Sequence, residues 1–201
     1  MTVDMWVLLF ALTVIGLIFF ATLLTGSPPM PTSSRALKTM MAVLPQRLPG
    51  APRSHIYELG SGWGGLAVAL AKKYPDHTVT GFERSPLPLV YAKIRSFLNK
   101  SAHPEFKNKN FLKCDLRDAG LVVCYLMPQT MARLKEKFEA ELPDGCLVLC
   151  NTFVVPGWTP LDRVRANDFS ASEIYLYEMG ISQQPPSVHV TSFPDLRSNA
   201  D

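Results

Sequence analysis

The hydrophobic and polar positions divide the chain into one long apolar run and a mixed region that follows it. Residues 5–24 (MWVLLFALTVIGLIFFATLL) contain no ionisable side chain. About 20 residues at 1.5 Å each make roughly 30 Å, which is the thickness of the hydrocarbon core of a bilayer. The run exceeds the usual apolar segment of a signal peptide, and neither a basic start nor a small-residue cleavage site accompanies it. The pattern therefore predicts one transmembrane helix, an anchor over residues 1–25.

Charges beside the apolar run predict its orientation. Only Asp4 precedes the run, whereas four basic residues follow it closely: Arg35, Lys38, Arg47 and Arg53. Positive charge stays on the cytoplasmic side of a membrane span. We therefore expect a single-pass membrane protein whose remaining chain lies on the cytoplasmic side, or on the matrix side in a mitochondrion.

Residues 26–53 form a predicted linker that contains one short helix. The segment GSPPMP (26–31) holds three prolines, which exclude a helix there. Residues 32–44 have apolar side chains at helical spacing, and Ser33 or Ser34 can cap the helix. We interpret its apolar stripe (Leu37, Met40, Met41 and Leu44) as a packing surface rather than a substrate groove.

From residue 54 to 180, short apolar runs alternate with helical stretches. Strands are expected over 55–59, 78–83, 110–114, 121–127 and 146–154, and helices over 65–74, 86–98 (capped by Ser85) and 128–142. Apolar strands separated by helices predict an α/β fold with a doubly wound, mostly parallel sheet. Two further runs, 161–166 and 172–179, leave no room for a helix and predict a terminal antiparallel hairpin, which makes seven strands. The polar tail, 181–201, is predicted to be disordered.

A glycine-rich turn follows the first predicted strand. Gly60, Gly62 and Gly65 satisfy the pattern GxGxxG between a strand and a helix, which is typical of a cradle for a nucleotide-type cofactor. Glu58 precedes the turn, and Glu83 ends the second strand, where a carboxylate can accept both ribose hydroxyls. The glycines alone do not choose between NAD and another cofactor.

Across residues 54–180 the chain resembles the class I, seven-β-strand methyltransferases that use S-adenosylmethionine (SAM). ELGSGWGG (58–65) matches their first motif, with Trp63 where Asp, Thr or Ser is more usual. The resemblance implies a Rossmann-like fold with SAM as the cofactor. Glu58 would face the methionine amino group, Glu83 the ribose and Asp115 the adenine, with Leu116 beside the ring. The candidate cofactor-binding residues are Glu58, Gly60, Ser61, Gly62, Trp63, Gly64, Glu83, Arg84, Asp115 and Leu116.

The apolar N-terminus, the segment LMPQ (126–129) and the segment ELP (141–143) resemble a narrower group. These are the membrane-anchored protein-lysine methyltransferases that modify the ATP synthase c-subunit and the adenine nucleotide carrier. The resemblance implies lysine N-methylation of a membrane protein, with Tyr125, Pro128 and Gln129 on the acceptor side and the Gln129 amide oxygen facing the ammonium. Two alternatives stay open: methylation of a lipid or small hydrophobic molecule, and a non-catalytic SAM- or NAD-binding membrane adaptor.

Composition narrows the classes of partner. The chain has 20 Lys and Arg against 17 Asp and Glu, a net charge of +3, and no interleaving of basic and aromatic residues, so no nucleic-acid partner is predicted. Cys146 and Cys150 are four residues apart without a histidine pair, so no metal site is predicted. All four cysteines, Cys114, Cys124, Cys146 and Cys150, lie in or beside apolar runs. We expect buried, reduced thiols, which agrees with a reducing compartment.

Overall fold

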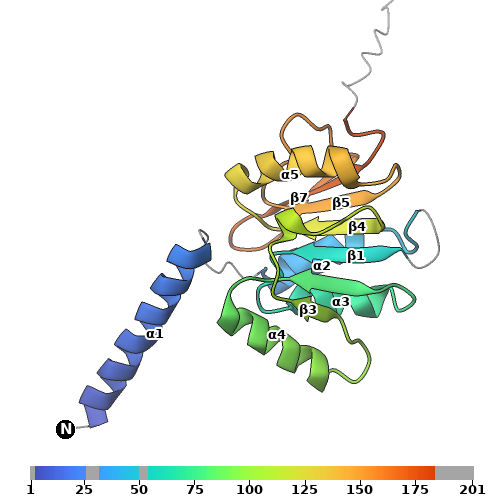
Figure 1. Cartoon of the computed structure of the whole chain (residues 1–201). Helices are drawn as coiled ribbons and strands as arrows, with labels where there is room; N and C mark the ends of the chain where they lie inside the picture. Colours follow the sequence, from blue (N-terminus) through green and yellow to red (C-terminus); the bar gives the residue numbers. More distant parts are fainter. Residues whose placement is uncertain (1–2, 26–31, 50–53, 184–201) are drawn as a thin grey trace, which may run out of the picture.

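The computed structural model describes residues 3–25, 32–49 and 54–183 (Figure 1). After the N-terminal helix, the chain folds into one sheet covered by helices. The helices are α1 (Val3–Thr25), α2 (Ser34–Val43), α3 (Gly65–Lys73), α4 (Pro86–Leu98) and α5 (Pro128–Glu141). The strands are β1 (His55–Leu59), β2 (Val79–Phe82), β3 (Glu105–Lys107), β4 (Ala119–Cys124), β5 (Leu147–Asn151), β6 (Asp162–Arg165) and β7 (Glu173–Glu178).

The seven strands have the order β3-β2-β1-β4-β5-β7-β6. β1 to β5 are parallel, while β7 runs antiparallel to both β5 and β6. The predicted doubly wound, mostly parallel sheet and its terminal hairpin are therefore confirmed. β1 lies between β2 and β4, so the direction of winding reverses there. Open α/β sheets bind ligands at such a switch point, beyond the carboxyl ends of the strands.

The side chains of β1 alternate between two hydrophobic cores. Ile56 belongs to the core beneath α2, α3 and α4. Tyr57 and Leu59 belong to the core beneath α5, together with the fully buried Leu134 and Phe138 of that helix. Successive residues of a strand point to opposite faces, so β1 supports both layers. Helices thus cover both faces of the sheet, and its carboxyl edge is left for a site.

The starts of α2 and α4 are held in different ways. Ser33 caps α2, because its hydroxyl oxygen accepts the backbone N–H of Ala36 at 3.0 Å. Ser85 occupies the same position before α4 but forms no side-chain cap bond. Its backbone N–H donates instead to Glu83 Oε1 at 2.7 Å. The cap predicted for the Ser33–Ser34 pair is confirmed, and the side-chain cap predicted for Ser85 is wrong.

The third strand lies earlier in the chain than the sequence predicted. β3 ends at Lys107, and Phe111–Lys113 form a turn of 3-10 helix. The side-chain oxygen of Asn110 accepts the backbone N–H of Leu112 at 3.1 Å, a local bond that competes with strand pairing. The strand predicted over 110–114 is therefore wrong. Its apolar side chains pack, partly buried, against the core beneath α5.

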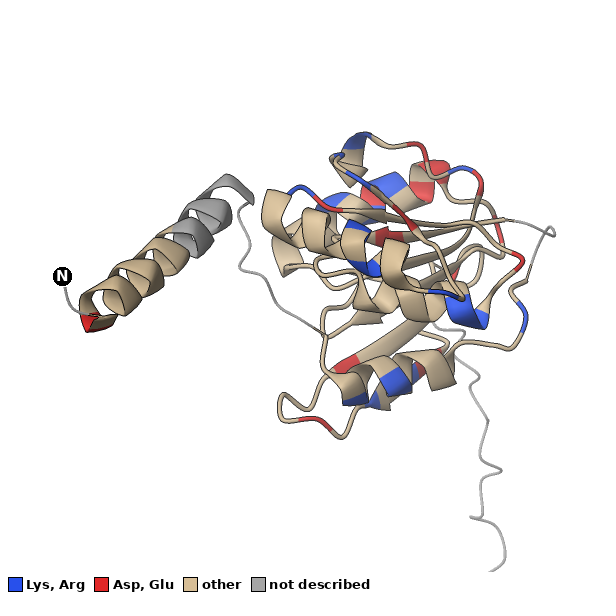
Figure 2. Ribbon diagram, turned by 90° about the horizontal axis from the view of Figure 1, so that it is seen from below, with Lys and Arg blue, Asp and Glu red and all other residues tan. Residues whose placement is uncertain are grey.

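Helix α1 carries exposed apolar side chains such as Trp6 and Phe10. Asp4 lies in its first turn, and Figure 2 shows red, the colour of Asp and Glu, at the start of the helix. Within the described ranges, no helix is long and apolar enough to cross a membrane, and the structure does not support the predicted transmembrane helix over 5–24. The predicted GSPPMP spacer (26–31) and most of the predicted tail, from 184 onward, lie outside the described residues.

Candidate cofactor and acceptor site

Three glycines with positive φ join β1 to α3. The φ angles are 77° at Gly60, 49° at Gly62 and 74° at Gly64. Residues with a Cβ adopt this region only with strain. A Cβ on Gly64 would also lie 2.6 Å from Phe106 Cζ and 2.9 Å from Ala92 Cβ. Both the turn and the close approach of β3 and α4 therefore require glycine at this position.

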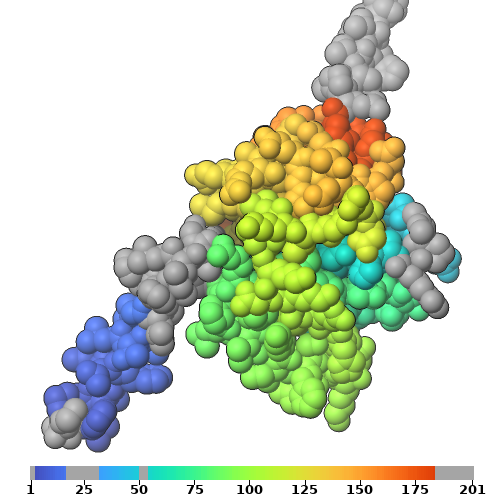
Figure 3. All heavy atoms as spheres, viewed as in Figure 1, coloured from blue at the N-terminus to red at the C-terminus, as the bar shows by residue number. Residues whose placement is uncertain are grey.

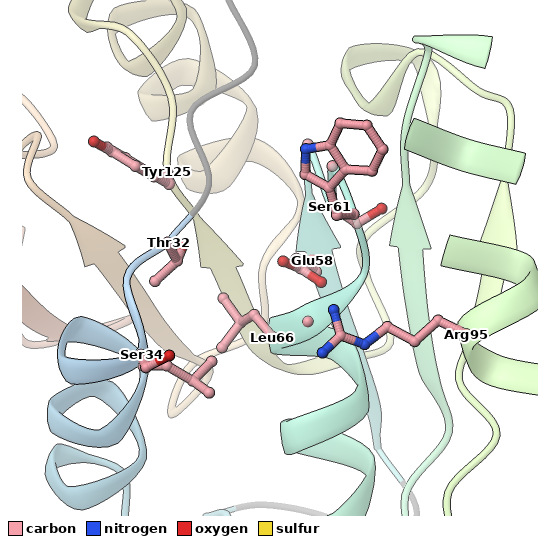
Figure 4. A pocket seen from close by; sticks show the side chains of 12 residues that line it. Thr32, Ser34, Glu58, Ser61, Leu66, Arg95 and Tyr125 are labelled. Atoms are coloured by element: carbon pink, nitrogen blue, oxygen red, sulfur yellow. The ribbon is translucent and has the colours of Figure 1, made fainter. Parts of the chain in front are cut away.

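A cavity of about 290 Å³ opens beside this turn (Figure 4). It lies at the carboxyl ends of β1 and β4, where the switch point of the sheet predicts a ligand site. In Figure 4, Glu58 and Ser61 lie between Arg95 on one side and Tyr125 on the other. The lining includes seven residues that the sequence marked: Glu58, Gly60, Ser61, Gly62, Trp63, Gly65 and Tyr125.

Glu58 is the buried carboxylate of the cavity. It is 6% exposed, and its Oε2 has no hydrogen-bond partner among the described residues. Burial raises the pKa of Glu58 well above its ordinary range, a backbone hydrogen bond from Ala67 lowers it, and the charge of Glu83 raises it. The Ser61 hydroxyl is also buried without a partner in the described chain. Unpaired buried polar atoms are costly, so these two oxygens fit a cationic, hydrogen-bonding ligand group.

Glu83 ties the glycine turn to the start of α4. Its Oε2 accepts the backbone N–H of Gly62 at 2.9 Å, and its Oε1 accepts that of Ser85 at 2.7 Å. Charge-assisted bonds of this kind are stronger than neutral ones and hold the turn in shape. Glu83 and the exposed Arg84 are not part of the described lining of the cavity. Their contact with the cofactor stays a prediction.

Asp115 and Leu116 are not brought to the cavity. Asp115 faces solvent, where both its oxygens accept hydrogen bonds from the Arg117 guanidinium at 2.6–3.1 Å. These bonds lower the pKa of Asp115 to about 2. Leu116 is fully buried, and its N–H donates to Glu141 Oε2 at 3.1 Å. Because β3 ends at Lys107, Asp115 does not stand at a strand end as the sequence prediction assumed.

On the acceptor side, only Tyr125 of the three predicted residues lines the cavity. Its ring stacks on Phe153 from the segment after β5, with the centroids 6.2 Å apart and an interplanar angle of 26°. Pro128 and Gln129 are exposed at the start of α5. Proline favours the first position of a helix, so the structure gives these two residues a helix-starting role.

Helices α2 and α4 contribute lining residues that the sequence did not mark. Thr32 lies just before α2, Ser34 and Leu37 come from the start of α2, and Arg95 comes from α4. The apolar stripe of α2 was interpreted as packing only, yet Leu37 also faces the cavity. No motif marks Arg95, since only the packing of α4 beside α3 brings it there. A Cβ at Gly65, the first residue of α3, would lie 3.4 Å from Arg95 Nη1.

Trp63 has a structural contact of its own. Its ring meets Tyr91 of α4 edge to face, with the centroids 5.4 Å apart and an interplanar angle of 81°. Edge-to-face contacts of this kind favour association beyond simple burial. The unusual tryptophan of the first motif therefore connects the cavity to the outer side of α4.

The cysteines and the acidic residues form no metal centre in the part of the chain that the structure describes, where no group of three or more His, Cys, Asp or Glu could hold an ion. All four cysteines are free, as predicted. Cys124, Cys146 and Cys150 are buried, as expected, whereas Cys114 is partly exposed. Burial raises the pKa of Cys146 to about 12, which keeps that thiol protonated and unreactive.

Comparisons of the chain with known proteins agree with a SAM site at this cavity. Residues 58–162 match the family described as "ANTKMT methyltransferase domain". The chain is 30% identical over 153 residues to the ATP synthase c-subunit lysine N-methyltransferase of Rattus norvegicus, which covers 72% of this chain and 67% of that protein. It is also 30% identical over 153 residues to the adenine nucleotide translocase lysine N-methyltransferase of Mus musculus, covering 72% of this chain and 64% of that protein. The matches thus span about two thirds of these relatives' length.

Among solved structures, the fold is similar to that of an RNA methyltransferase from Salinibacter ruber in complex with S-adenosyl-L-homocysteine. The TM-score is 0.65 at 22% identity, over 79% of this chain and 97% of that one. This likeness shows the fold, and the family match, together with the strand order and the glycine turn, defines a class I methyltransferase with SAM as its cofactor. The unpaired oxygens of Glu58 and Ser61 fit that cofactor. More narrowly, the chain belongs to the ANTKMT methyltransferase domain family, whose match begins at Glu58 itself.

Proposed function

We propose that this protein transfers the methyl group of SAM to the side-chain amine of a lysine on a membrane protein. The observation that carries the proposal is the buried Glu58, whose unpaired oxygen lies in a cavity that Tyr125 lines from the opposite side. The names of the rat and mouse relatives, lysine N-methyltransferases of the ATP synthase c-subunit and of adenine nucleotide translocase, support lysine as the acceptor.

The residues of the cavity would hold the charged end of the cofactor. The Glu58 carboxylate can accept hydrogen bonds from a cationic amino group, which would lower its pKa again. The Ser61 hydroxyl can donate or accept one more bond. Glu83 already fixes Gly62, so the turn is preorganised and binding spends little on ordering it. When bound, SAM supplies an electrophilic methyl group on a sulfonium centre.

The acceptor lysine must lose its proton before its nitrogen can attack. With an ordinary pKa near 10.4, this costs about 4.6 kcal/mol at pH 7, at about 1.36 kcal/mol per unit. A water-poor pocket beside the Tyr125 and Phe153 rings would lower the pKa of the lysine, and the ring faces would attract its cation on entry. The rest of the rate enhancement would come from holding the lysine nitrogen in line with the methyl group, in near-attack geometry. Gln129, exposed at the start of α5, is proposed as a contact for the incoming ammonium.

The proposal includes attachment to a membrane through α1. Its support is the sequence of residues 5–24, which lacks ionisable side chains, and the exposed apolar side chains at the start of α1. The basic residues after this run favour a domain on the cytoplasmic or matrix side. Attachment would raise the effective concentration of the domain around a membrane substrate without any new contact.

A labelled-methyl assay on the full chain tests the chemistry. The protein is incubated with methyl-labelled SAM and proteoliposomes that contain the ATP synthase c-subunit, and mass spectrometry locates the label. We expect label on a lysine Nζ. Glu58→Gln should lose most of this activity, whereas Glu136→Gln should keep it, because Glu136 is an exposed carboxylate on α5.

Two results would contradict the lysine assignment. Label confined to the lipid fraction would indicate a lipid or small hydrophobic acceptor. Binding of SAM without transfer to any component of a whole membrane fraction would indicate a binding module. Attachment is tested separately: the full chain should stay with the vesicles through high-salt and alkaline washes, and its release by the salt wash would contradict attachment through α1.

A further inference from the structure

Helix α4 exposes an apolar stripe to solvent. Its side chains recur every three or four residues, which places them on one side of the helix. Phe97 is 84% exposed and Leu98 is 70% exposed. The opposite side of α4 is buried against the domain. We define the α4 stripe as Leu87, Val90, Tyr91, Ile94, Phe97 and Leu98.

Positive charges border the α4 stripe. At 3.6 residues per turn, Lys93 lies on one flank of the stripe and Arg95 on the other, and Lys100 follows the end of the helix. Residues 86–98 contain no Asp or Glu. An apolar face with cationic flanks is the arrangement of helices that lie in the interface of an anionic membrane. The long stems of Lys and Arg can remain on the apolar side while their charges reach the headgroups.

The same charges disfavour contact between two copies of the stripe. A two-fold interface places the same patch of each copy against the other. Lys93 and Arg95 of one copy would then meet those of the second, and α4 offers no carboxylate to pair them. Like charges brought together in this way weaken an interface. Charge complementarity therefore selects anionic lipid as the occupant.

The α4 stripe reaches the edge of the cavity. Tyr91 in the stripe contacts Trp63, which lines the cavity, and Arg95 on its flank lines the cavity as well. Figure 3 shows α4 in green at the surface of the domain. A membrane seated on the stripe would therefore lie beside the site rather than on a remote face.

We propose that the α4 stripe rests in the interface of an anionic lipid bilayer, with Lys93, Arg95 and Lys100 at the level of the phosphate groups. This second contact orients the domain so that the cavity lies next to the bilayer. The inference rests on the membrane setting proposed above and is independent of methyl transfer.

Spin labels at two matched positions of the full chain test this contact. Phe97→Cys places a label on the stripe, and Phe169→Cys places one between β6 and β7, at the opposite edge of the sheet from β3; both phenylalanines are highly exposed. Both variants carry Cys114→Ser, because the other cysteines are buried. The chain is bound to vesicles of phosphatidylcholine and phosphatidylglycerol. Collisions of the label with a water-soluble nickel chelate should fall roughly fivefold at position 97 and hardly change at position 169.

The outcomes separate the α4 contact from attachment through α1. Equal protection from the chelate at both positions, or none at either, in chains that do bind the vesicles would overturn the α4 contact and leave attachment through α1 standing. Failure of the full chain to bind vesicles would overturn both. Spin–spin broadening at position 97 that disappears on dilution with unlabelled chain would show contact between copies instead. Replacing phosphatidylglycerol with phosphatidylcholine should weaken the protection at position 97, and unchanged protection would contradict the role of the three cations.

Discussion

Glu83, the carboxylate after β2, and Asp115, the carboxylate expected directly after β3, lie in different environments of the same fold. Glu83 accepts two backbone hydrogen bonds, one of them from Gly62 in the glycine turn. Asp115 faces solvent and pairs with Arg117. The cause is the distance along the chain between each carboxylate and the end of the strand that precedes it. β2 pairs with β1 up to its last residue, so Glu83 stands at the edge of the sheet, whereas β3 stops at Lys107.

A polar residue after an apolar run therefore marks a site at the edge of the sheet only if that run really forms a strand. β1 and β2 are buried along almost their whole length; the residues that follow β1 line the cavity, and Glu83 directly after β2 accepts a hydrogen bond from their turn. The apolar residues near 111–114 belong to a 3-10 turn, which does not end at the edge of the sheet. Variants at the two carboxylates can test how far this difference extends to binding.

Glu83→Gln should have the largest effect on cofactor binding. The amide presents two hydrogens where one carboxylate oxygen accepted, so the backbone N–H of either Gly62 or Ser85 loses its partner. Each charge-assisted bond contributes about 1.5–3 kcal/mol, and the upper part of this range predicts a loss of up to roughly 150-fold in SAM affinity. Calorimetric titration with SAM and S-adenosylhomocysteine measures the loss.

Asp115→Asn is the matched control for that measurement. Because Asp115 is solvent-exposed and outside the cavity, its loss should change SAM affinity by less than about threefold. A loss as large as that of Glu83→Gln would show that Asp115 leaves Arg117 and reaches the bound cofactor. The sequence-based assignment of Asp115 to the adenine would then be correct.

Glu58→Gln should have opposite effects on binding and on the stability of the ligand-free chain. The raised pKa of Glu58 in the folded state means that its stabilising contribution is complete below the ordinary pKa and declines as pH rises through the folded-state pKa. The glutamine variant should lack this decline. It should also bind SAM about 10- to 30-fold more weakly, since a charge-assisted bond is lost. Denaturant unfolding across pH measures how the stability of the wild type and of Glu58→Gln depends on pH, with Glu136→Gln as the control.

Proton release gives a second measure of Glu58. If an amino group pairs with its carboxylate, the pKa of Glu58 falls on binding, and a proton leaves wherever the carboxyl is protonated in the free protein. Titrations in buffers of different ionisation enthalpy should show this proton for the wild type and not for Glu58→Gln. The same release from both proteins would assign the proton to another group.

Gly64→Ala should destabilise the chain more than Gly145→Ala. Both glycines have positive φ, at 74° and 80°, so both substitutions strain the backbone by about 1 kcal/mol. Only the Cβ at position 64 would also meet Phe106 and Ala92, whereas the one at 145 has nothing within 4 Å. We expect an additional cost of roughly 1–2 kcal/mol from this overpacking, measured by denaturant unfolding. Equal costs would mean that β3 and α4 move aside freely.

The sequence predicted the features that depend on local pattern. The central strands, the glycine turn and Glu58 follow from apolar runs and a fixed glycine spacing, and the structure brings them together. The sequence did not predict β3, because only Phe106 of its three residues is buried and no apolar run marks the strand. Arg95 reaches the cavity through the packing of α4 beside α3, which no spacing in the sequence reveals.

The α4 stripe shows a second kind of limit. From the sequence, the apolar residues of α4 predict a helix that packs on a core. The structure shows that Leu89 and Ala92 serve that purpose, while Ile94 and Phe97 remain exposed. Periodicity gives the spacing of apolar positions but does not say which of the two apolar sides of α4 meets the domain. The surface that we assign to lipid could therefore be recognised only after folding.

Arg117→Gln should have the smallest effect and the most local one. The Arg117 side chain is the main cause of the low pKa of Asp115, about 2, so its removal should bring that pKa back toward the ordinary value near 3.9. A lowered folded-state pKa contributes stability above the ordinary pKa and loses it as pH falls through the folded one. Both groups are exposed and screened by solvent, so we expect no measurable change in unfolding at pH 7. Carboxyl resonances followed by NMR between about pH 2 and 6 test the shift, and an unchanged pKa would mean that Arg117 does not hold Asp115 in solution. Asp115 would then be free to turn toward the cofactor. The difference between Glu83, which supports the glycine turn, and Asp115, which faces solvent, would then hold only for the ligand-free chain.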